Sequence, residues 1–354
     1  MFRRRTEGRR AVGTFATLAA LLALATMAFL PSPFITQSPG PTFDTLGETD
    51  EGPIIEVSDA ETYPVDGELR LLTISLRGNP DNPLNWAEVA AAYFSPDQTV
   101  LPMEAVYGQV TVEERNQQSQ ADMENSQDTA IAAALLQLGY DVDVRVWAAG
   151  VLPGSPADGI LQDGDVLLTV NGETIWDAYT IRNAAAESDD PVTIVYERDG
   201  EVGEAVIEPE ESDGIRLIGV QAMSDVDLPL DVTIALPNVG GPSAGMMFSL
   251  GVIERLTSGS MTGSVAWAGT GTMSVSGAVG SIGGVVQKMH GALDAGAEWM
   301  LVPAENCGEV AGNVPSGLNV VPVETLTEAQ SVVEVVANAD GDPERVSTPL
   351  PSCG

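Results

Sequence analysis

The sequence of 354 residues is poor in three residue types that often carry chemistry: it has one lysine, one histidine and two cysteines. The lysine, Lys288, is followed by Met289, whereas a Walker A loop requires Gly-Lys-Ser/Thr, so that kind of ATPase site is excluded. A single histidine, His290, and two cysteines leave no sensible zinc site, and neither a metal nor another cofactor is expected. Any chemistry must rest on other groups.

Basic residues are scarce as well. Lysine and arginine together number 15 against 51 aspartates and glutamates, which gives a formal net charge of −36 at pH 7. Five of the arginines lie within residues 1–10, so the rest of the chain is even more acidic. A surface of this sign repels the phosphates of nucleic acids, and nucleic-acid binding is therefore not expected.

One long apolar run is present, at residues 11–30, and it contains no charged residue. Helical residues rise about 1.5 Å each, so this run spans the ~30 Å hydrocarbon core of a bilayer and predicts a single transmembrane anchor. Arginines precede the run, and residues 31–52 contain no lysine or arginine. The positive-inside bias thus predicts a cytoplasmic segment at residues 1–10, with the bulk of the chain on the extracytoplasmic face of the cell membrane. A cleaved signal peptide is the alternative, because Ala-Leu-Ala at residues 23–25 resembles a cleavage site.

Both cysteines, Cys307 and Cys353, lie beyond the predicted anchor, in a compartment expected to be oxidising. A disulfide between them would hold the C-terminal tail, residues 336–354. Two free thiols are the alternative. No cysteine lies near residues 11–30, which excludes a lipoprotein anchor.

The region after the anchor has clear secondary-structure signals. Residues 31–53 predict a linker, and their stretch rich in proline and glycine, residues 31–47, is either a stiff spacer or the entry to the first strand. Residues 68–76 have the character of a strand, and helical apolar spacing occurs at residues 85–93 and 129–138. Residues 110–127 are polar and predict either a helix or a loop.

Residues 142–172 show a pattern of short strands and turns. Gly-Ser-Pro-Ala at residues 154–157 precedes a Gly-Asp turn at residues 164–165, which leads into a strand ending at Asn-Gly. This pattern resembles the core of a PDZ domain and predicts such a module, a small β-barrel with helices, at residues 139–208. The resemblance implies a groove in which an extended peptide adds as a strand, with residues 175–186 as the groove helix.

Leu138, Gly139 and Tyr140 resemble the apolar-Gly-apolar loop that opens PDZ grooves and binds a peptide carboxylate. The same three residues fit the C-terminal cap of a helix equally well, because glycine commonly ends helices. Both interpretations stay open from the sequence.

A serine lies between a predicted strand, residues 232–236, and a strongly apolar predicted helix, residues 246–256. At the beginning of this helix, Ser243 would be surrounded by unpaired N–H groups that can stabilise an oxyanion. A simple N-cap is the alternative role for this residue.

The run Gly-Pro-Ser-Ala-Gly at residues 241–245 also satisfies Gly-x-Ser-x-Gly, the nucleophile elbow of α/β-hydrolases. That scheme requires an acid and then a histidine further along the chain. The only histidine is His290, and the only carboxylate between it and Ser243 is Glu254, within the predicted helix. A Ser-His-acid triad is therefore excluded.

The one lysine is informative because all the other residues among the 15 lysines and arginines are arginines. Arginine stays protonated and cannot act as a general base, whereas a desolvated lysine can. The sequence thus predicts that Lys288 is needed as a deprotonatable amine. Retention by chance is the alternative.

Gly-Pro-Ser-Ala-Gly, followed 45 residues after its serine by the lysine of Ile-Gly-Gly-x-x-x-Lys, resembles the proteolytic domain of Lon-type peptidases. The resemblance covers about residues 232–309. It implies that Ser243 is the nucleophile, that Lys288 is the general base and that the Thr270 hydroxyl holds the lysine amine, with Gly241 in a supporting role. ATP-dependent Lon enzymes carry an acidic residue where Gly240 stands, so gating of the site by a carboxylate is not expected here.

An anchor, a PDZ module and this proteolytic domain together resemble the YlbL-type Lon-like peptidases of bacteria. The expected fold class is α+β, with the proteolytic domain at residues 213–335 and the PDZ module inserted between it and residues 54–138. The resemblance assigns residues 54–138 to the N-terminal part of the protease region.

The predicted function is that of a membrane-anchored, ATP-independent serine endopeptidase. Because the chain lacks a Walker A loop, unfolding of stable substrates is not expected, and flexible peptides, unfolded chains or segments of membrane proteins are the expected substrates. Lon relatives form rings, so a homo-oligomer is an expected partner. The alternative function is a catalytically inactive PDZ adaptor at the same membrane face.

Overall fold

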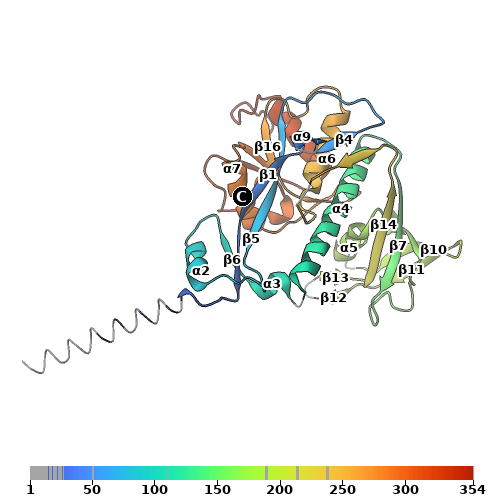
Figure 1. Ribbon diagram of the computed structural model, residues 1–354. Coiled ribbons are helices and arrows are strands. Elements are labelled where there is room, and N and C mark those ends of the chain that lie inside the picture. Colours follow the sequence, from blue (N-terminus) through green and yellow to red (C-terminus); the bar gives the residue numbers. More distant parts are fainter. Residues whose placement is uncertain are drawn as a thin grey trace, which may run out of the picture.

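The computed structural model describes residues 15, 18, 22, 26, 28–49, 52–108, 110–187, 190–212, 215–236 and 239–353. In these residues the chain forms a mixed α/β fold with two large sheets, each of which has its own hydrophobic core (Figure 1).

The first sheet has six strands in the order β20-β19-β16-β5-β1-β6. β16 pairs in parallel with β5 and β19, and β1 pairs antiparallel with β5 and β6. Strands from both halves of the chain therefore share one sheet. The strands are β1 (Phe34–Asp44), β5 (Glu68–Arg77), β6 (Thr99–Pro102), β16 (Ala266–Gly269), β19 (Trp299–Pro303) and β20 (Asn319–Val323).

Helices cover both faces of this sheet, and the side chains alternate between the two faces as the pleat requires. Leu71 and Leu301 belong to the core on one face, and their neighbours Leu72 and Val302 belong to the core on the other. The first core includes residues of α4 (Val112–Gln137), α6 (Gly245–Leu256) and α9 (Leu326–Ala337), and the second includes residues of α7 (Val285–Asp294).

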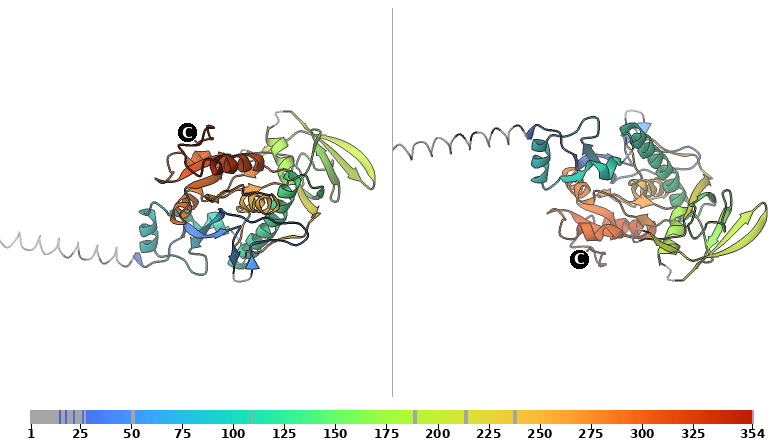
Figure 2. Two further views of the ribbon diagram at one scale, coloured as in Figure 1. Left: turned by 90° about the horizontal axis from the view of Figure 1, so that it is seen from above. Right: turned by 90° about the horizontal axis from the view of Figure 1, so that it is seen from below.

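The second sheet, which together with its helix we call the inserted unit (residues 143–227), lies at the opposite end of the molecule from α2 (Trp86–Tyr93; Figures 1 and 2). Its strand order is β11-β10-β8-β7-β14, and β9 pairs with β8. The strands and helix are β7 (Asp143–Val151), β8 (Val166–Val170), β9 (Glu173–Thr174), α5 (Ala178–Glu187), β10 (Val192–Arg198), β11 (Glu201–Ile207) and β14 (Val220–Asp227).

The boundary predicted for this module needs correction. Strand β14 pairs along its length with β7, so the inserted unit extends past residue 208 to Asp227. The proteolytic domain predicted to begin at residue 213 therefore overlaps the second sheet. The sequence could not show this, because strand pairing between distant segments leaves no local signal.

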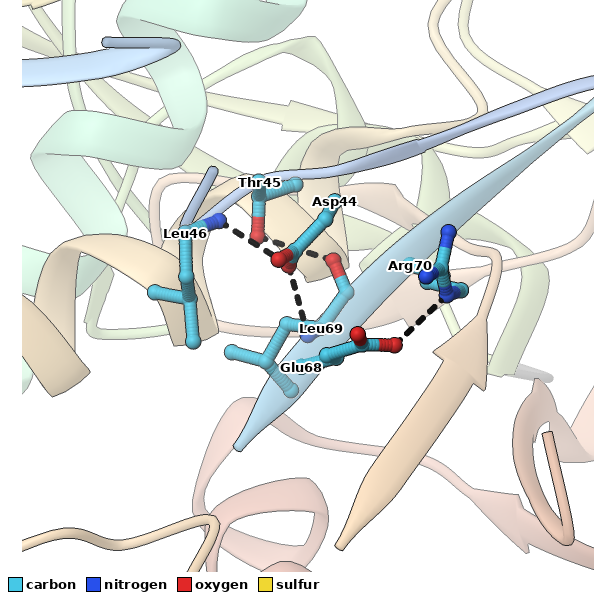
Figure 3. A network of polar contacts seen from close by, with 6 residues as sticks. All are labelled: Asp44, Thr45, Leu46, Glu68, Leu69 and Arg70. Carbon is cyan, nitrogen blue, oxygen red and sulfur yellow. Dashed lines mark hydrogen bonds and ion pairs between the residues drawn. The ribbon is translucent and has the colours of Figure 1, made fainter. Parts of the chain in front are cut away.

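The prediction of a linker at residues 31–53 is wrong for β1, which lies between two other strands of the first sheet. The end of β1 is fastened to the beginning of β5 (Figure 3). Asp44 Oδ1 accepts hydrogen bonds from the N–H groups of Leu46 at 3.2 Å and Leu69 at 3.0 Å. The Thr45 hydroxyl donates to the Leu69 carbonyl at 3.0 Å.

Helix α4 is longer than the sequence predicted, because the polar residues 112–127 continue it towards the N-terminus. Thr111 and Glu114 form a capping box at its beginning, which satisfies N–H groups that have no intrahelical partner. At its end Gly139 has φ +85°, and the Tyr140 N–H donates to the Leu135 carbonyl at 3.0 Å. Leu138, Gly139 and Tyr140 are thus the helix cap, and their assignment to a carboxylate loop is wrong.

The predicted strand at residues 68–76 and helix at residues 85–93 are confirmed as β5 and α2. The remaining elements are α2 (Trp86–Tyr93), α3 (Met103–Tyr107), the 3-10 helix η1 (Ala304–Asn306), α8 (Cys307–Val310) and the strand pairs β2 (Glu48–Thr49) with β3 (Gly52–Pro53), β4 (Ile55–Val57) with β15 (Val232–Ile234), β12 (Glu210–Ser212) with β13 (Ile215–Leu217), and β17 (Thr272–Met273) with β18 (Val279–Gly280).

Among the residues that the structure describes, no helix has the length and apolar character needed to cross a bilayer. The anchor predicted at residues 11–30 lies for the most part outside the described residues.

Candidate active site

Ser243 lies in the tight loop that leads into α6, and α4 holds this loop in place. Gly241 has φ +85°, a conformation that favours glycine, and its N–H donates to the Ser119 carbonyl at 2.8 Å. The Ser126 hydroxyl donates to the Pro242 carbonyl at 3.1 Å. Both of these contacts come from α4, so a helix from the N-terminal half of the chain positions the serine.

The same packing explains why residue 240 is a glycine. A Cβ atom at Gly240 would collide with the side chain of Ser119 on α4. A side chain at this position would require the Ser119 hydroxyl to rotate away, and its Cβ would still lie 3.1 Å from the Ser119 Cβ and 3.2 Å from the Ser119 carbonyl oxygen, which are tight contacts. The loop and α4 are therefore closely packed at Gly240.

Lys288 reaches the serine from the opposite helical layer. It lies one turn into α7, which begins after Gly284 at φ +72°, and its side chain is buried, with only 1% exposed. Lys288 Nζ lies 2.7 Å from Ser243 Oγ. Two predicted site residues that are 45 positions apart in the chain are thus within hydrogen-bonding distance.

Thr270 completes the polar contacts of the lysine amine. It follows the last residue of β16, at the carboxyl end of a strand that runs parallel to both neighbours. Its Oγ1 lies 2.8 Å from Lys288 Nζ and donates to the Ser243 carbonyl at 3.0 Å. One hydroxyl therefore bridges the amine and the backbone of the serine.

Burial determines the charge of the lysine. Desolvation lowers the pKa of Lys288 to about 7, because the buried ammonium form is disfavoured. Among the described residues no acidic group opposes this shift. The neutral amine is consequently a substantial fraction of the lysine near pH 7.

A cavity of about 340 Å³ opens in front of Ser243. One wall is formed by β5, where residues 71–75 line the cavity, and the other includes Met123 of α4 and Val239. Pairing of β5 with β16 ends at Leu71. Within the described chain, the next residues of β5 are paired with β1 alone, which leaves one edge of the strand open towards the serine.

A second groove, of about 200 Å³, lies in the inserted unit between α5 and residues 217–222. The sequence predicted the groove helix correctly, but it missed the facing segment, Leu217-Ile218-Gly219-Val220. This tetrapeptide is itself an apolar-Gly-apolar run, so the signal was present. Leu138, Gly139 and Tyr140 do not line the groove.

The predicted disulfide is present: Cys307 and Cys353 are joined, with an S–S distance of 2.12 Å. Cys353 packs against the apolar core that includes Val285 and Met289 of α7, the helix of Lys288. In the part of the chain that the structure describes, histidine, cysteine and carboxylate side chains form no group of three suited to holding a metal ion.

Comparison with known families places this site in a recognised type of domain. Residues 222–337 match the sequence model described as the Lon protease (S16) C-terminal proteolytic domain, a range that contains Ser243, Thr270 and Lys288. The match supports a serine peptidase. It does not include β1, β5 or α4, which the structure adds to the same sheet and site.

Curated relatives are similar to this chain over segments about as long as the range that the family model matches. Lon protease 2 of Bacillus subtilis is 30% identical over 114 residues, which are 32% of this chain and 20% of that protein. The archaeal Lon protease of Methanothermobacter thermautotrophicus is 35% identical over 106 residues, 29% of this chain and 16% of that protein. The chain thus spans a fifth or less of the length of these relatives.

Among solved structures, the chain is similar to the PDZ domain of an SdrC-like protein from Listeria innocua. The two are 24% identical, with a TM-score of 0.21, over 22% of this chain and 92% of that domain.

Proposed function

We propose that this protein is an ATP-independent serine endopeptidase in which Ser243 attacks the peptide bond and Lys288 takes its proton. The observation that supports this most directly is the distance of 2.7 Å between Lys288 Nζ and Ser243 Oγ. A general base must lie within hydrogen-bonding distance of the proton that it removes. The match of residues 222–337 to a serine peptidase domain is independent support.

The reaction begins from the neutral amine. As Ser243 Oγ bonds to the carbonyl carbon of the substrate, Lys288 Nζ takes the Oγ proton, and the carbonyl π electrons move to the oxygen. The ammonium then gives its proton to the leaving nitrogen as the C–N bond breaks, which leaves an acyl ester on Ser243. A water molecule, deprotonated by the same amine, attacks the ester, and the proton returns to Oγ.

The oxyanion needs hydrogen-bond donors that are free at the start of the reaction. The Gly241 N–H already donates to the Ser119 carbonyl, so it is not one of them. We assign this role to the N–H groups of Ser243 and Ala244, which lie at the beginning of α6, where N–H groups lack intrahelical acceptors and the helix dipole is positive.

The substrate lies along β5 in this proposal. An extended peptide that adds to the open edge beyond Leu71 would cross the 340 Å³ cavity and bring its backbone to Ser243. Only a segment without stable structure can adopt this conformation. Since the sequence has no Walker A loop to drive unfolding, flexible peptides, unfolded chains and segments of membrane proteins are the substrates that we propose.

Two further parts complete the proposal. The groove between α5 and residues 217–222 binds a peptide, either a substrate or a partner, by adding it as a strand. The apolar residues 11–30 anchor the protein in the membrane, with the N-terminus cytoplasmic and the remainder extracytoplasmic.

Peptide cleavage by the full-length protein in detergent tests the catalytic part. Ser243→Ala and Lys288→Arg should each lower kcat/KM on an unstructured fluorogenic peptide by at least about a hundredfold, because arginine cannot accept the proton. Ser258→Ala, an exposed serine beyond the far end of α6, is the matched control and should leave cleavage unchanged. Cleavage that persists in both folded site variants contradicts the proposal and favours a non-enzymatic adaptor.

The proposed orientation is tested by adding a protease to intact cells. Both the inserted unit and the proteolytic domain should be digested without lysis. Survival of these regions until the cells are broken would overturn the orientation.

A further inference from the structure

Helix α2 presents an unusual surface to solvent. Its inward side chains, Val89 and Ala92, are buried. A surface helix ordinarily places charged and polar residues on the opposite face. Here the exposed side chains of the helix and its C-cap are three alanines and three large aromatic rings: Trp86 is 41% exposed, Tyr93 75% and Phe94 83%. We call these three residues the α2 aromatic face.

Charge is nearly absent from this helix, although the chain has 51 acidic residues. Its one acidic residue is Glu88, which is engaged locally. One oxygen accepts a hydrogen bond from the Asn85 N–H at 3.0 Å, and the other lies 3.6 Å from the Arg77 guanidinium. The one carboxylate of α2 is therefore partly exposed but engaged with Asn85 and Arg77, and the α2 aromatic face itself consists of uncharged side chains.

The position of α2 indicates what covers this face. The backbone N–H of Trp86 donates to the carbonyl of Leu30, the last residue of the apolar run 11–30, at 3.3 Å. The Trp86 ring packs edge-on against Phe34 with a centroid distance of 5.7 Å. Phe29 and Leu30 are themselves exposed, at 78% and 54%. The aromatic face thus adjoins the point where the predicted anchor meets the folded chain (Figure 1).

We propose that the α2 aromatic face lies in the headgroup interface of the lipid bilayer, as a second membrane contact beside the anchor. This inference rests on the anchoring part of the proposed function. Tryptophan and tyrosine favour this interface, because their rings are apolar while their N–H and O–H groups remain hydrated. The contact depends on aromatic insertion and not on charge, since an acidic protein is repelled by anionic lipids.

The contact has a consequence for the rest of the molecule. A single anchor leaves a domain free to rotate about the membrane normal and to tilt, whereas a second contact restricts the tilt. The inserted unit lies at the end of the molecule opposite α2 in each view (Figures 1 and 2). With α2 on the bilayer, the peptide groove is held away from the membrane surface, where chains emerging from the membrane or free in solution can reach it.

Quenching of tryptophan fluorescence in vesicles tests this inference. The full-length protein is reconstituted into phosphatidylcholine vesicles whose acyl chains carry bromine either near the headgroup or deep in the bilayer. The tryptophan emission of the wild type should be quenched more than that of Trp86→Phe. The part of the quenching that Trp86 accounts for should be larger with shallow bromine than with deep bromine. Trp147→Phe, in the inserted unit, is the matched control and should not lower the quenching by brominated lipid.

A second variant tests the other two rings without removing the reporter. Tyr93→Ser combined with Phe94→Ser should lower the quenching of Trp86 at least about twofold, whereas Val202→Ser, an exposed apolar residue of the inserted unit, should not. Equal quenching in the wild type and Trp86→Phe overturns the inference. Cross-linking of two copies through Tyr93 without lipid quenching also overturns it and assigns the face to self-association.

Flotation of the same vesicles separates this inference from the proposal on which it rests. Protein that floats with the lipid but shows no Trp86 quenching contradicts the second contact alone. Protein that fails to float contradicts the anchor and the second contact together.

Discussion

Asp177 and Val275 join the inserted unit to the part of the chain that carries Ser243 and Lys288: the Val275 N–H donates a hydrogen bond to Asp177 Oδ2 at 2.8 Å. The other carboxylate oxygen of Asp177 accepts from the Thr180 N–H at 2.9 Å, just at the beginning of the groove helix α5. Val275 is buried and lies between β17 and β18, a few residues beyond Thr270. One carboxylate thus links the groove of the inserted unit to the loop next to the candidate active site.

Asp177→Asn should weaken this link without changing the shape of the side chain. An asparagine has one acceptor oxygen where two are required, so one of the two N–H groups loses its partner. A buried N–H without a partner costs about 1–3 kcal/mol, and a loss of this size in the free energy of unfolding should appear in urea denaturation. We also expect kcat/KM for a flexible peptide to fall severalfold, because the loop after Thr270 is less firmly held.

The matched control for this prediction is Asp158→Asn. Asp158 accepts a hydrogen bond from the Gly154 N–H at 2.7 Å, a contact that lies wholly within the inserted unit. It should leave peptide cleavage unchanged. Equal effects of the two variants on cleavage would show that the link between the units has no functional role.

Peptide cleavage should rise with pH through a midpoint near 7. Only the neutral amine of Lys288 can accept the serine proton, and burial lowers the pKa of this lysine to about 7 from its ordinary value of 10.5. The measurement is kcat/KM for an uncharged peptide between about pH 5 and 9. A midpoint near 10, or a flat profile, contradicts the role of Lys288 as the base.

Lys288→Met should stabilise the protein relative to the wild type, and this advantage should be larger at neutral pH than at alkaline pH. Between pH 7 and 10.5 the unfolded wild type binds a proton on Lys288 that the folded state does not. Wild-type stability therefore rises with pH in this window, by up to 1.36 kcal/mol per unit, and methionine abolishes that slope.

Comparison of the two proteins cancels the titration of every other group. The stability advantage of Lys288→Met, measured by urea unfolding, should shrink by about 2 kcal/mol between pH 7 and pH 9. An advantage that does not change with pH would mean that Lys288 is charged in the folded protein.

Thr270→Val should lower kcat/KM about tenfold to a hundredfold, whereas Thr270→Ser should retain most of the activity. Valine has the same shape but removes both the contact with Lys288 Nζ at 2.8 Å and the hydrogen bond to the Ser243 carbonyl at 3.0 Å. Loss of a hydrogen bond to a buried amine is worth roughly 1–3 kcal/mol, and each 1.36 kcal/mol is a factor of ten in rate. The midpoint of the pH profile should also shift, which a purely structural role would not produce. Activity of Thr270→Val equal to that of Thr270→Ser would contradict this positioning role.

Local features of the site could be predicted from short runs of residues. The run Gly-Gly-Pro-Ser before an apolar helix predicted a serine at a helix beginning, and the retention of a single lysine pointed to Lys288. The pairing of the two cysteines and the position of the groove helix were predicted as well. The serine position, the disulfide and the groove helix were predicted correctly because each depends on neighbours in the chain, or on residue types so few that the alternatives are limited, whereas the role of Lys288 stays a prediction.

How distant segments of the chain meet could not be predicted from the sequence and is known from the fold. Of the two interpretations of residues 31–47, the linker was wrong and the entry to the first strand was right, because proline and glycine are also tolerated in a strand whose neighbours fix it, as β5 and β6 fix β1. The Leu138-Gly139-Tyr140 prediction failed because an apolar-Gly-apolar run is common to helix caps and carboxylate loops. The sequence alone does not show which apolar-Gly-apolar run, residues 138–140 or residues 217–220, lies beside α5.

Likewise, the depressed pKa of Lys288 exists only in the folded chain. Its cause is burial of the amine, which lies on α7 and packs against the first sheet and the serine loop. Desolvation depends on which atoms surround the amine in space. A sequence can specify a lysine, but only the packing around it in the folded chain makes the neutral amine a substantial fraction near pH 7.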